Sequence, residues 1–226
     1  KLPLPDQLTL SPDPERPIIL SDDGTEFTAE AAARLSDQGW KVVVWSYPEG
    51  LYSAGRVKQS EDFPVVRQSE PGAVGIQAAL DNIRSTHGIP AGFIHLHPTR
   101  SDSGELFSPL EEDLIKQVFL ICGSLKTDLN HSSNSGRNLL LIVLRGEGDL
   151  SVSGENGFQE GSGLSGLAKT LRWEWPDVFC RYIDLSRELE IEPAARSLLA
   201  EIQDPDRSLV EVGISPTSRQ TLKRQS

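Results

Sequence analysis

The chain contains one glycine pattern typical of a phosphate-binding loop, Gly161-Ser162-Gly163-Leu164-Ser165-Gly166, where a helix is expected to begin. Such a loop lets the backbone approach a pyrophosphate, and Asp184 ends the next expected strand, where a ribose-binding carboxylate would lie. The residues before Gly161 argue against a phosphate-binding loop. Such a loop must directly follow a buried strand, and the nearest apolar run ends at Arg145. Close packing of the helix on a sheet explains the glycines as well. A dinucleotide site at Gly161–Gly166 with Asp184 remains the alternative.

The turn after the first expected strand, Ser21–Thr25 (SDDGT), is a second candidate phosphate site. In nucleotide-binding α/β folds, this turn normally brings several glycines to the phosphate. Here it has one glycine, and the carboxylates of Asp22 and Asp23 would repel a pyrophosphate. Capping the helix that follows suits these acids better. We therefore predict no cofactor-binding residue in this chain.

Catalytic groups of the common kinds are also missing. Reductases that use tyrosine as a proton donor place a Lys or an Asn four positions after it, whereas Tyr47, Tyr52 and Tyr182 are followed there by Leu51, Arg56 and Ser186. No G-x-S-x-G nucleophile elbow is present. We predict no catalytic residue.

His95 and His97 alternate on an expected strand and should therefore face the same side, as two metal ligands would. No third ligand follows at a convincing spacing, so we predict no metal site. Cys122 and Cys180 likewise lack a ligand partner nearby, and we expect two buried, reduced thiols.

Short apolar runs alternate with amphipathic stretches over most of the chain. Strands are expected near 18–20, 41–45, 63–67, 92–96, 138–145, 178–185 and 209–214, and helices near 28–38, 72–86, 108–130, 163–175 and 192–203. This order predicts an α/β fold, Rossmann-like but truncated and degenerate, with a mainly parallel sheet covered by helices on both faces. We expect residues 1–16, with four prolines, to be a linker or arm, 17–214 to be the domain, and 215–226 to be a C-terminal crossover or tail.

Composition narrows the class of protein further. The net charge of −11 argues against nucleic acid and anionic membranes as partners. No apolar run reaches the roughly 18 residues of a membrane span, and no signal peptide is visible, so we expect a cytoplasmic protein. Methionine is absent, even at position 1, which suggests a piece of a longer chain.

Several stretches, in this order, carry a resemblance to a family: residues 92–96 (GFIHL), 139–146 (LLLIVLRG), 163–171 (GLSGLAKTL), 174–176 (EWP) and 183–185 (IDL). They resemble the N-terminal structural subdomain of type I polyketide synthase ketoreductases, and the version here is most similar to bacterial polyunsaturated-fatty-acid synthases. The resemblance covers about residues 17–214.

The resemblance implies a ketoreductase of two Rossmann-like halves, in which the second half carries NADPH and the Ser, Tyr, Lys and Asn catalytic group. This chain would then be the first half, not an enzyme by itself and without a cofactor, in a multifunctional synthase that reduces β-ketoacyl groups on acyl carrier protein. Its expected partners are the catalytic half, neighbouring synthase domains and acyl carrier protein, with homodimers also possible.

The implied role is to brace the catalytic half, which requires an apolar docking surface. Trp173 and Trp175 are two positions apart and cannot share one helix face, so one should be core and the other exposed. The second candidate surface is the expected last strand, 209–214, as a sheet edge. A free-standing dimerisation or interaction module is the remaining alternative.

Overall fold

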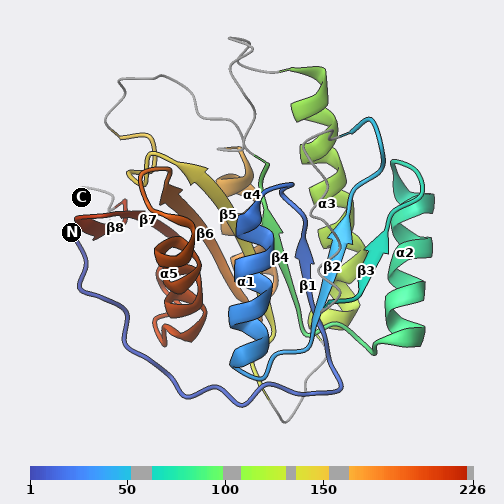
Figure 1. Ribbon diagram of the computed structural model, residues 1–226, viewed down its shortest axis with the longest axis horizontal. Helices are drawn as coiled ribbons and strands as arrows, with labels where there is room; N and C mark the ends of the chain where they lie inside the picture. Colours follow the sequence, from blue (N-terminus) through green and yellow to red (C-terminus); the bar gives the residue numbers. More distant parts are fainter. Residues whose placement is uncertain (52–62, 99–107, 131–135, 153–162, 223–226) are drawn as a thin grey trace.

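The computed structural model describes residues 1–51, 63–98, 108–130, 136–152 and 163–222. Within these residues one sheet lies between two layers of helices (Figure 1). The strands are β1 (Ile18–Ser21), β2 (Val42–Ser46), β3 (Val65–Arg67), β4 (Gly92–Leu96), β5 (Leu139–Gly146), β6 (Phe179–Ser186), β7 (Glu211–Ser215) and β8 (Ser218–Gln220). The helices are α1 (Glu26–Asp37), α2 (Ala73–Thr86), α3 (Pro109–Leu129), α4 (Leu164–Glu174) and α5 (Ile191–Gln203).

The strand order is β3-β2-β1-β4-β5-β6-β7-β8, and all neighbours are parallel except β7 and β8, which are antiparallel. The expected α/β fold with a mainly parallel sheet is therefore confirmed. The order of the strands along the chain reverses between β1 and β4. In open α/β sheets this switch point is where ligands bind, outside the carboxyl ends of the strands.

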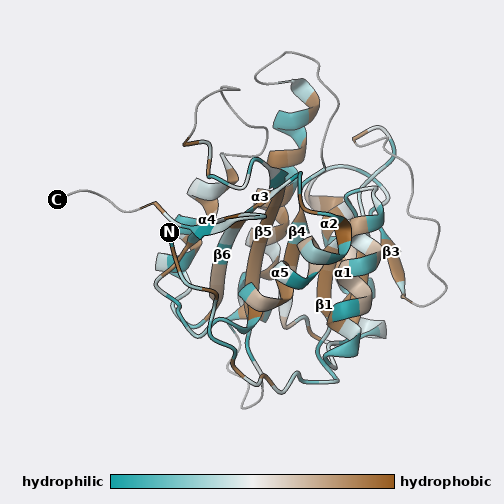
Figure 2. Cartoon of the chain, turned by 60° about the vertical axis from the view of Figure 1, so that its left-hand side comes forward, coloured by the Kyte–Doolittle hydropathy of each residue, from teal (hydrophilic) through white to brown (hydrophobic). Residues whose placement is uncertain are grey.

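The apolar runs form strands because helices cover both faces of the sheet. In β5, residues 140, 142 and 144 contribute to one core and residues 139, 141 and 143 to the other, as the two-residue period of a strand requires. Helices α2, α3 and α4 pack on the first face, and α1 and α5 on the second. Figure 2 shows the strands as brown, apolar ribbons between helices that are partly teal.

Helix starts follow local capping chemistry. Ser108 accepts a hydrogen bond from the Glu111 backbone N–H at 3.2 Å, and Pro109 occupies the first turn, as the sequence predicts. The first helix begins at Glu26, two residues before the start expected near 28. Thr25 caps α1 by accepting from Phe27 N–H, and Thr28 is helical and donates to Asp23 instead.

The C-terminal edge of the sheet also differs from the prediction. The strand expected at 209–214 is not an edge, because β8 pairs with β7 and covers it. Beyond β8, Leu2 of the N-terminal arm forms an isolated antiparallel bridge with Arg219. The start of the N-terminal arm therefore lies beside β8.

Residues 1–16 run along the outside of the domain and are held at several points. Leu2 N–H donates to Arg219 O at 2.7 Å and Leu8 N–H to Gln203 O at 2.9 Å. The guanidinium of Arg16 is buried and donates to Pro90 O at 2.9 Å and Asp128 O at 3.0 Å. No helix in the described parts of the chain is both long and apolar enough to span a membrane.

Candidate functional site

In the first turn, which follows β1 at the switch point, backbone N–H groups donate hydrogen bonds to the carboxylates of the same turn. Asp22 Oδ1 accepts from Gly24 N–H at 2.8 Å, and Asp23 Oδ1 accepts from Thr25 N–H at 2.9 Å and from the Thr28 hydroxyl at 2.7 Å. Burial raises the pKa of Asp22 above its usual value. Two of the N–H groups that a phosphate would use before α1, those of Gly24 and Thr25, are thus bonded to carboxylates.

Behind this turn lies a chain of buried polar side chains from four parts of the fold. Ser21 Oγ and Tyr47 Oη lie 3.1 Å and 3.0 Å from His95 Nδ1. His95 Nε2 lies 3.2 Å from His97 Nδ1, and His97 Nε2 lies 3.3 Å from Glu111 Oε2. The members come from β1, the segment after β2, β4 with the segment after it, and α3. We call these five residues the histidine network.

The histidine network is buried, which changes its acid–base behaviour. Burial, and after it the electrostatic effect of the adjacent His97, lowers the pKa of His95 well below its usual value, and burial raises the pKa of the Tyr47 hydroxyl. Ser21 also accepts from the Leu96 backbone N–H at 2.9 Å and so joins β1 to β4. At ordinary pH the network is therefore suited to holding the switch point together with a neutral His95.

The expectation that His95 and His97 share one side is confirmed, since their rings are in contact. In the described residues no group of three or more His, Cys, Asp or Glu side chains is arranged to hold a metal ion. Cys122 and Cys180 are free and buried, as predicted, and burial raises the pKa of both thiols. That the chain has no catalytic, cofactor-binding or metal residue stays a prediction.

The glycine pattern lies only partly within the described residues, since Gly161 and Ser162 fall outside them. A Cβ added to Gly163 or Gly166 would meet no atom within 4 Å, so the explanation of these glycines by close packing on the sheet is wrong. Asp184 is buried, and its Oδ2 accepts from Leu150 N–H at 2.9 Å. This hydrogen bond ties Asp184 to the segment after β5, which precedes the glycine pattern in the chain.

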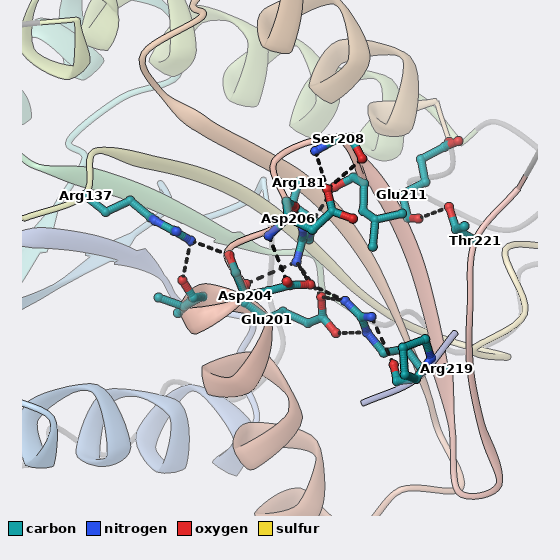
Figure 3. A network of polar contacts seen from close by, with 12 residues as sticks. Arg137, Arg181, Glu201, Asp204, Asp206, Ser208, Glu211, Arg219 and Thr221 are labelled. Carbon is teal, nitrogen blue, oxygen red and sulfur yellow. Dashed lines mark hydrogen bonds and ion pairs between the residues drawn. The ribbon is translucent and has the colours of Figure 1, made fainter. Parts of the chain in front are cut away.

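Four buried charges that the sequence analysis did not single out form a second polar cluster (Figure 3). Arg181 of β6 contacts Glu201 of α5 at 2.6 Å and Asp204 at 3.0 Å. Arg219 of β8 donates to Glu201 Oε1 at 2.6 Å and to Oε2 at 2.9 Å, and also binds Asp204. We call these four residues the charge clasp. Two positive and two negative side chains make its net charge zero.

The charge clasp also binds the backbone of the N-terminal arm and of the segment between α5 and β7. Arg219 donates to Pro3 O at 3.1 Å, and Arg181 donates to Leu209 O at 2.9 Å. Burial alone would lower the pKa of Arg219, but hydrogen bonds and charge from Glu201 and Asp204 raise it. The clasp fastens the N-terminal arm and the β7–β8 hairpin to α5. The one signal in the sequence was an arginine within the apolar run 178–185.

The fold places the chain among proteins shaped like short-chain dehydrogenases/reductases. It superposes on the 3-ketoacyl-(acyl-carrier-protein) reductase of Brucella melitensis, complexed with NADH, with a TM-score of 0.63 and 13% identity over 87% of this chain and 93% of that one. A short-chain oxidoreductase of Pseudomonas aeruginosa with an atypical catalytic centre gives a TM-score of 0.63 and 14% identity, over 90% and 98%. At these identities the likeness concerns the fold.

In sequence, the chain is similar to one of the subunits of the polyunsaturated fatty acid synthase of a Thraustochytrium species, at 28% identity over 218 residues. The match covers 93% of this chain and 7% of the length of that relative. No family model matches the chain.

These comparisons correct one expectation, that the chain by itself is not an enzyme. That expectation is wrong, because solved oxidoreductases share its fold over 93–98% of their own length, so the chain has the fold of an entire short-chain oxidoreductase. The fold is thus not that of a merely non-enzymatic fragment.

Proposed function

We propose that this chain is a domain of the ketoreductase region of a polyunsaturated-fatty-acid or polyketide synthase, and that it braces the catalytic half of that region. The synthase would be a cytoplasmic, multifunctional polypeptide in which the catalytic half uses NADPH to reduce β-ketoacyl groups on acyl carrier protein. Two findings support this proposal: the sequence similarity to part of a polyunsaturated fatty acid synthase, and the fold shared with a 3-ketoacyl-carrier-protein reductase.

The observation that carries the proposal is an uneven distribution of exposed apolar side chains. Among the described residues, the large exposed apolar side chains on helices are Val74, Leu110, Phe119 and Trp173, and all lie on α2, α3 and α4. Helices α1 and α5, on the other face, have none within the described residues. Contiguous exposed apolar surface usually marks a partner, and these four side chains are all on the layer that would present it.

Details of this layer favour a protein partner. Trp173 is 86% exposed, whereas Trp175, two positions on, is 1% exposed and belongs to the core, as expected of one tryptophan of the pair. On α3, Gly123 is exposed one turn after Phe119, with no atom within 4 Å of an added Cβ, which leaves room for a partner's side chain. The occupant we propose is the catalytic half, because the matched synthase polypeptide extends far beyond the length of this chain.

The proposal places NADPH in the catalytic half, since the first turn of this chain fills the phosphate position with Asp22 and Asp23. Adding the purified chain to NADPH should leave the cofactor fluorescence unchanged. The variant Gly163→Ala tests the alternative, a dinucleotide site at 161–166. Alanine fits at position 163 without a clash, so a change in NADPH binding would not come from misfolding. Saturable NADPH binding that Gly163→Ala abolishes would support the dinucleotide site at 161–166 instead.

Co-expression with the catalytic half of the same synthase tests the bracing role. We expect the chain to raise the reductase activity and the thermal stability of that half, and Trp173→Asp to weaken both effects. Leu4→Asp is the matched control, since Leu4 is as exposed as Trp173 but lies on the N-terminal arm. A catalytic half that is equally active and stable without this chain would refute the proposal. Sedimentation of the chain alone separates bracing from the alternative of a homodimer formed through the same layer.

A further inference from the structure

The histidine network joins four elements at the switch point, and the contact between its two rings has room for one proton. In the arrangement with two neutral rings, His95 Nε2–H donates to His97 Nδ1 across 3.2 Å. On its other side, His97 Nε2 lies 3.3 Å from Glu111 Oε2, a contact without the geometry of a hydrogen bond. His95 Nδ1 in turn accepts from the hydroxyl of Tyr47 or Ser21. Both imidazoles are neutral in this arrangement.

One additional proton fits into the same geometry. With that proton on His97 Nδ1, this nitrogen donates to His95 Nε2, and His95 carries its own proton on Nδ1, toward the oxygen of Ser21 or Tyr47. A second proton does not fit, because His95 Nε2–H and His97 Nδ1–H would then oppose each other at 3.2 Å. Two positive rings would also lie in contact inside the protein, where charge is costly.

The other groups near the two rings do not relieve this conflict. Tyr47 and Cys122 are neutral, and burial keeps both protonated. Glu111 of α3 is the acid that contacts the pair, and it contacts His97 rather than His95. Asp22 and Asp23, on the turn after β1, are bonded to the backbone of their own turn.

We propose that His95 and His97 form an acid-sensitive lock, which holds the carboxyl ends of β1 and β4 and the start of α3 together while the pair carries at most one additional proton, and releases them when a second proton binds. This inference is independent of the bracing role. In the unfolded chain both histidines bind protons near pH 6.5, so opening the lock takes up at least one proton. The stabilisation is fully present above pH 6.5 and is lost as the pH falls below it.

Imidazole ¹⁵N chemical shifts of the native protein, followed from pH 7.5 to 4.5, test the lock directly. We expect His95 and His97 never to be protonated together in molecules that keep the native amide spectrum. Below pH 6.5, the unfolding constant in urea should rise about tenfold per pH unit for each proton taken up. Full titration of both rings within an unchanged native spectrum would overturn the proposal.

A variant gives an independent measurement. In His97→Gln one ring of the opposing pair is gone, so protonation of His95 should no longer disrupt the native amide spectrum. His87→Gln is the matched control, because His87 is partly exposed at the end of α2 and its loss should leave the acid-induced change of the wild type in place. A loss of the native spectrum at acid pH that is the same in His97→Gln as in the wild type would refute the lock. If His97→Gln does not fold, the shifts of the native protein decide.

Discussion

Removing one acid from the charge clasp should strongly destabilise the domain. Glu201→Gln keeps the shape of the side chain but leaves Arg181 and Arg219 facing only Asp204, so the net charge of the buried cluster changes from zero to +1. Three N–H donors lose a charged acceptor, at 2.6, 2.6 and 2.9 Å. Breaking a buried ion pair in this way costs about 3–5 kcal/mol, so the unfolding constant should rise at least a hundredfold.

Urea denaturation, followed by the fluorescence of the buried tryptophans Trp45 and Trp175, measures this loss. Glu192→Gln is the matched control, since it makes the same chemical change on the same helix at an exposed ion pair with Arg34 and Arg196. We expect its unfolding midpoint to equal that of the wild type. If Glu201→Gln is no less stable than Glu192→Gln, the clasp does not stabilise the fold as argued.

Other predictions follow from single positions. Gly88→Ala should cost at least about 1 kcal/mol, because φ is +104° and an added Cβ would lie 2.1 Å from a backbone oxygen, while Gly163→Ala, with open space, should leave the melting temperature unchanged. Asp23→Ala, which removes the acceptor of Thr25 N–H and the Thr28 hydroxyl, should cost about 0.5–2 kcal/mol in urea unfolding. Cys122 and Cys180 should resist alkylation at pH 8 until the chain unfolds, because burial keeps them protonated; rapid labelling of the native protein would contradict this.

The order of strands and helices could be predicted from the sequence because apolar periodicity along one segment reports how that segment is covered. The run LLLIVL in β5 is apolar at every position and is covered on both faces. β8 could not be predicted this way, since Ser218, Arg219 and Gln220 are polar and form a strand because β7 lies beside them. Its pairing depends on tertiary contacts rather than on local pattern.

The histidine network and the charge clasp likewise depend on contacts between elements that are distant in the sequence. Alternation along the strand predicted that His95 and His97 face one side, but the third member, Glu111, lies on another element and is reached through the fold. The partners of Arg181 come from α5, the residue after it, and β8. An arginine within an apolar strand indicates that a buried acid must exist, and it does not say which acid.

The bridge between Leu2 and Arg219 has a mechanical consequence. Tension applied to the two ends of the chain first separates this antiparallel pair, one hydrogen bond at a time, and then the β7–β8 hairpin held by Arg219. The other six parallel strands lie beyond that hairpin. The charge clasp, which binds Arg219 and through it the backbone of Pro3, therefore resists this first step of separation.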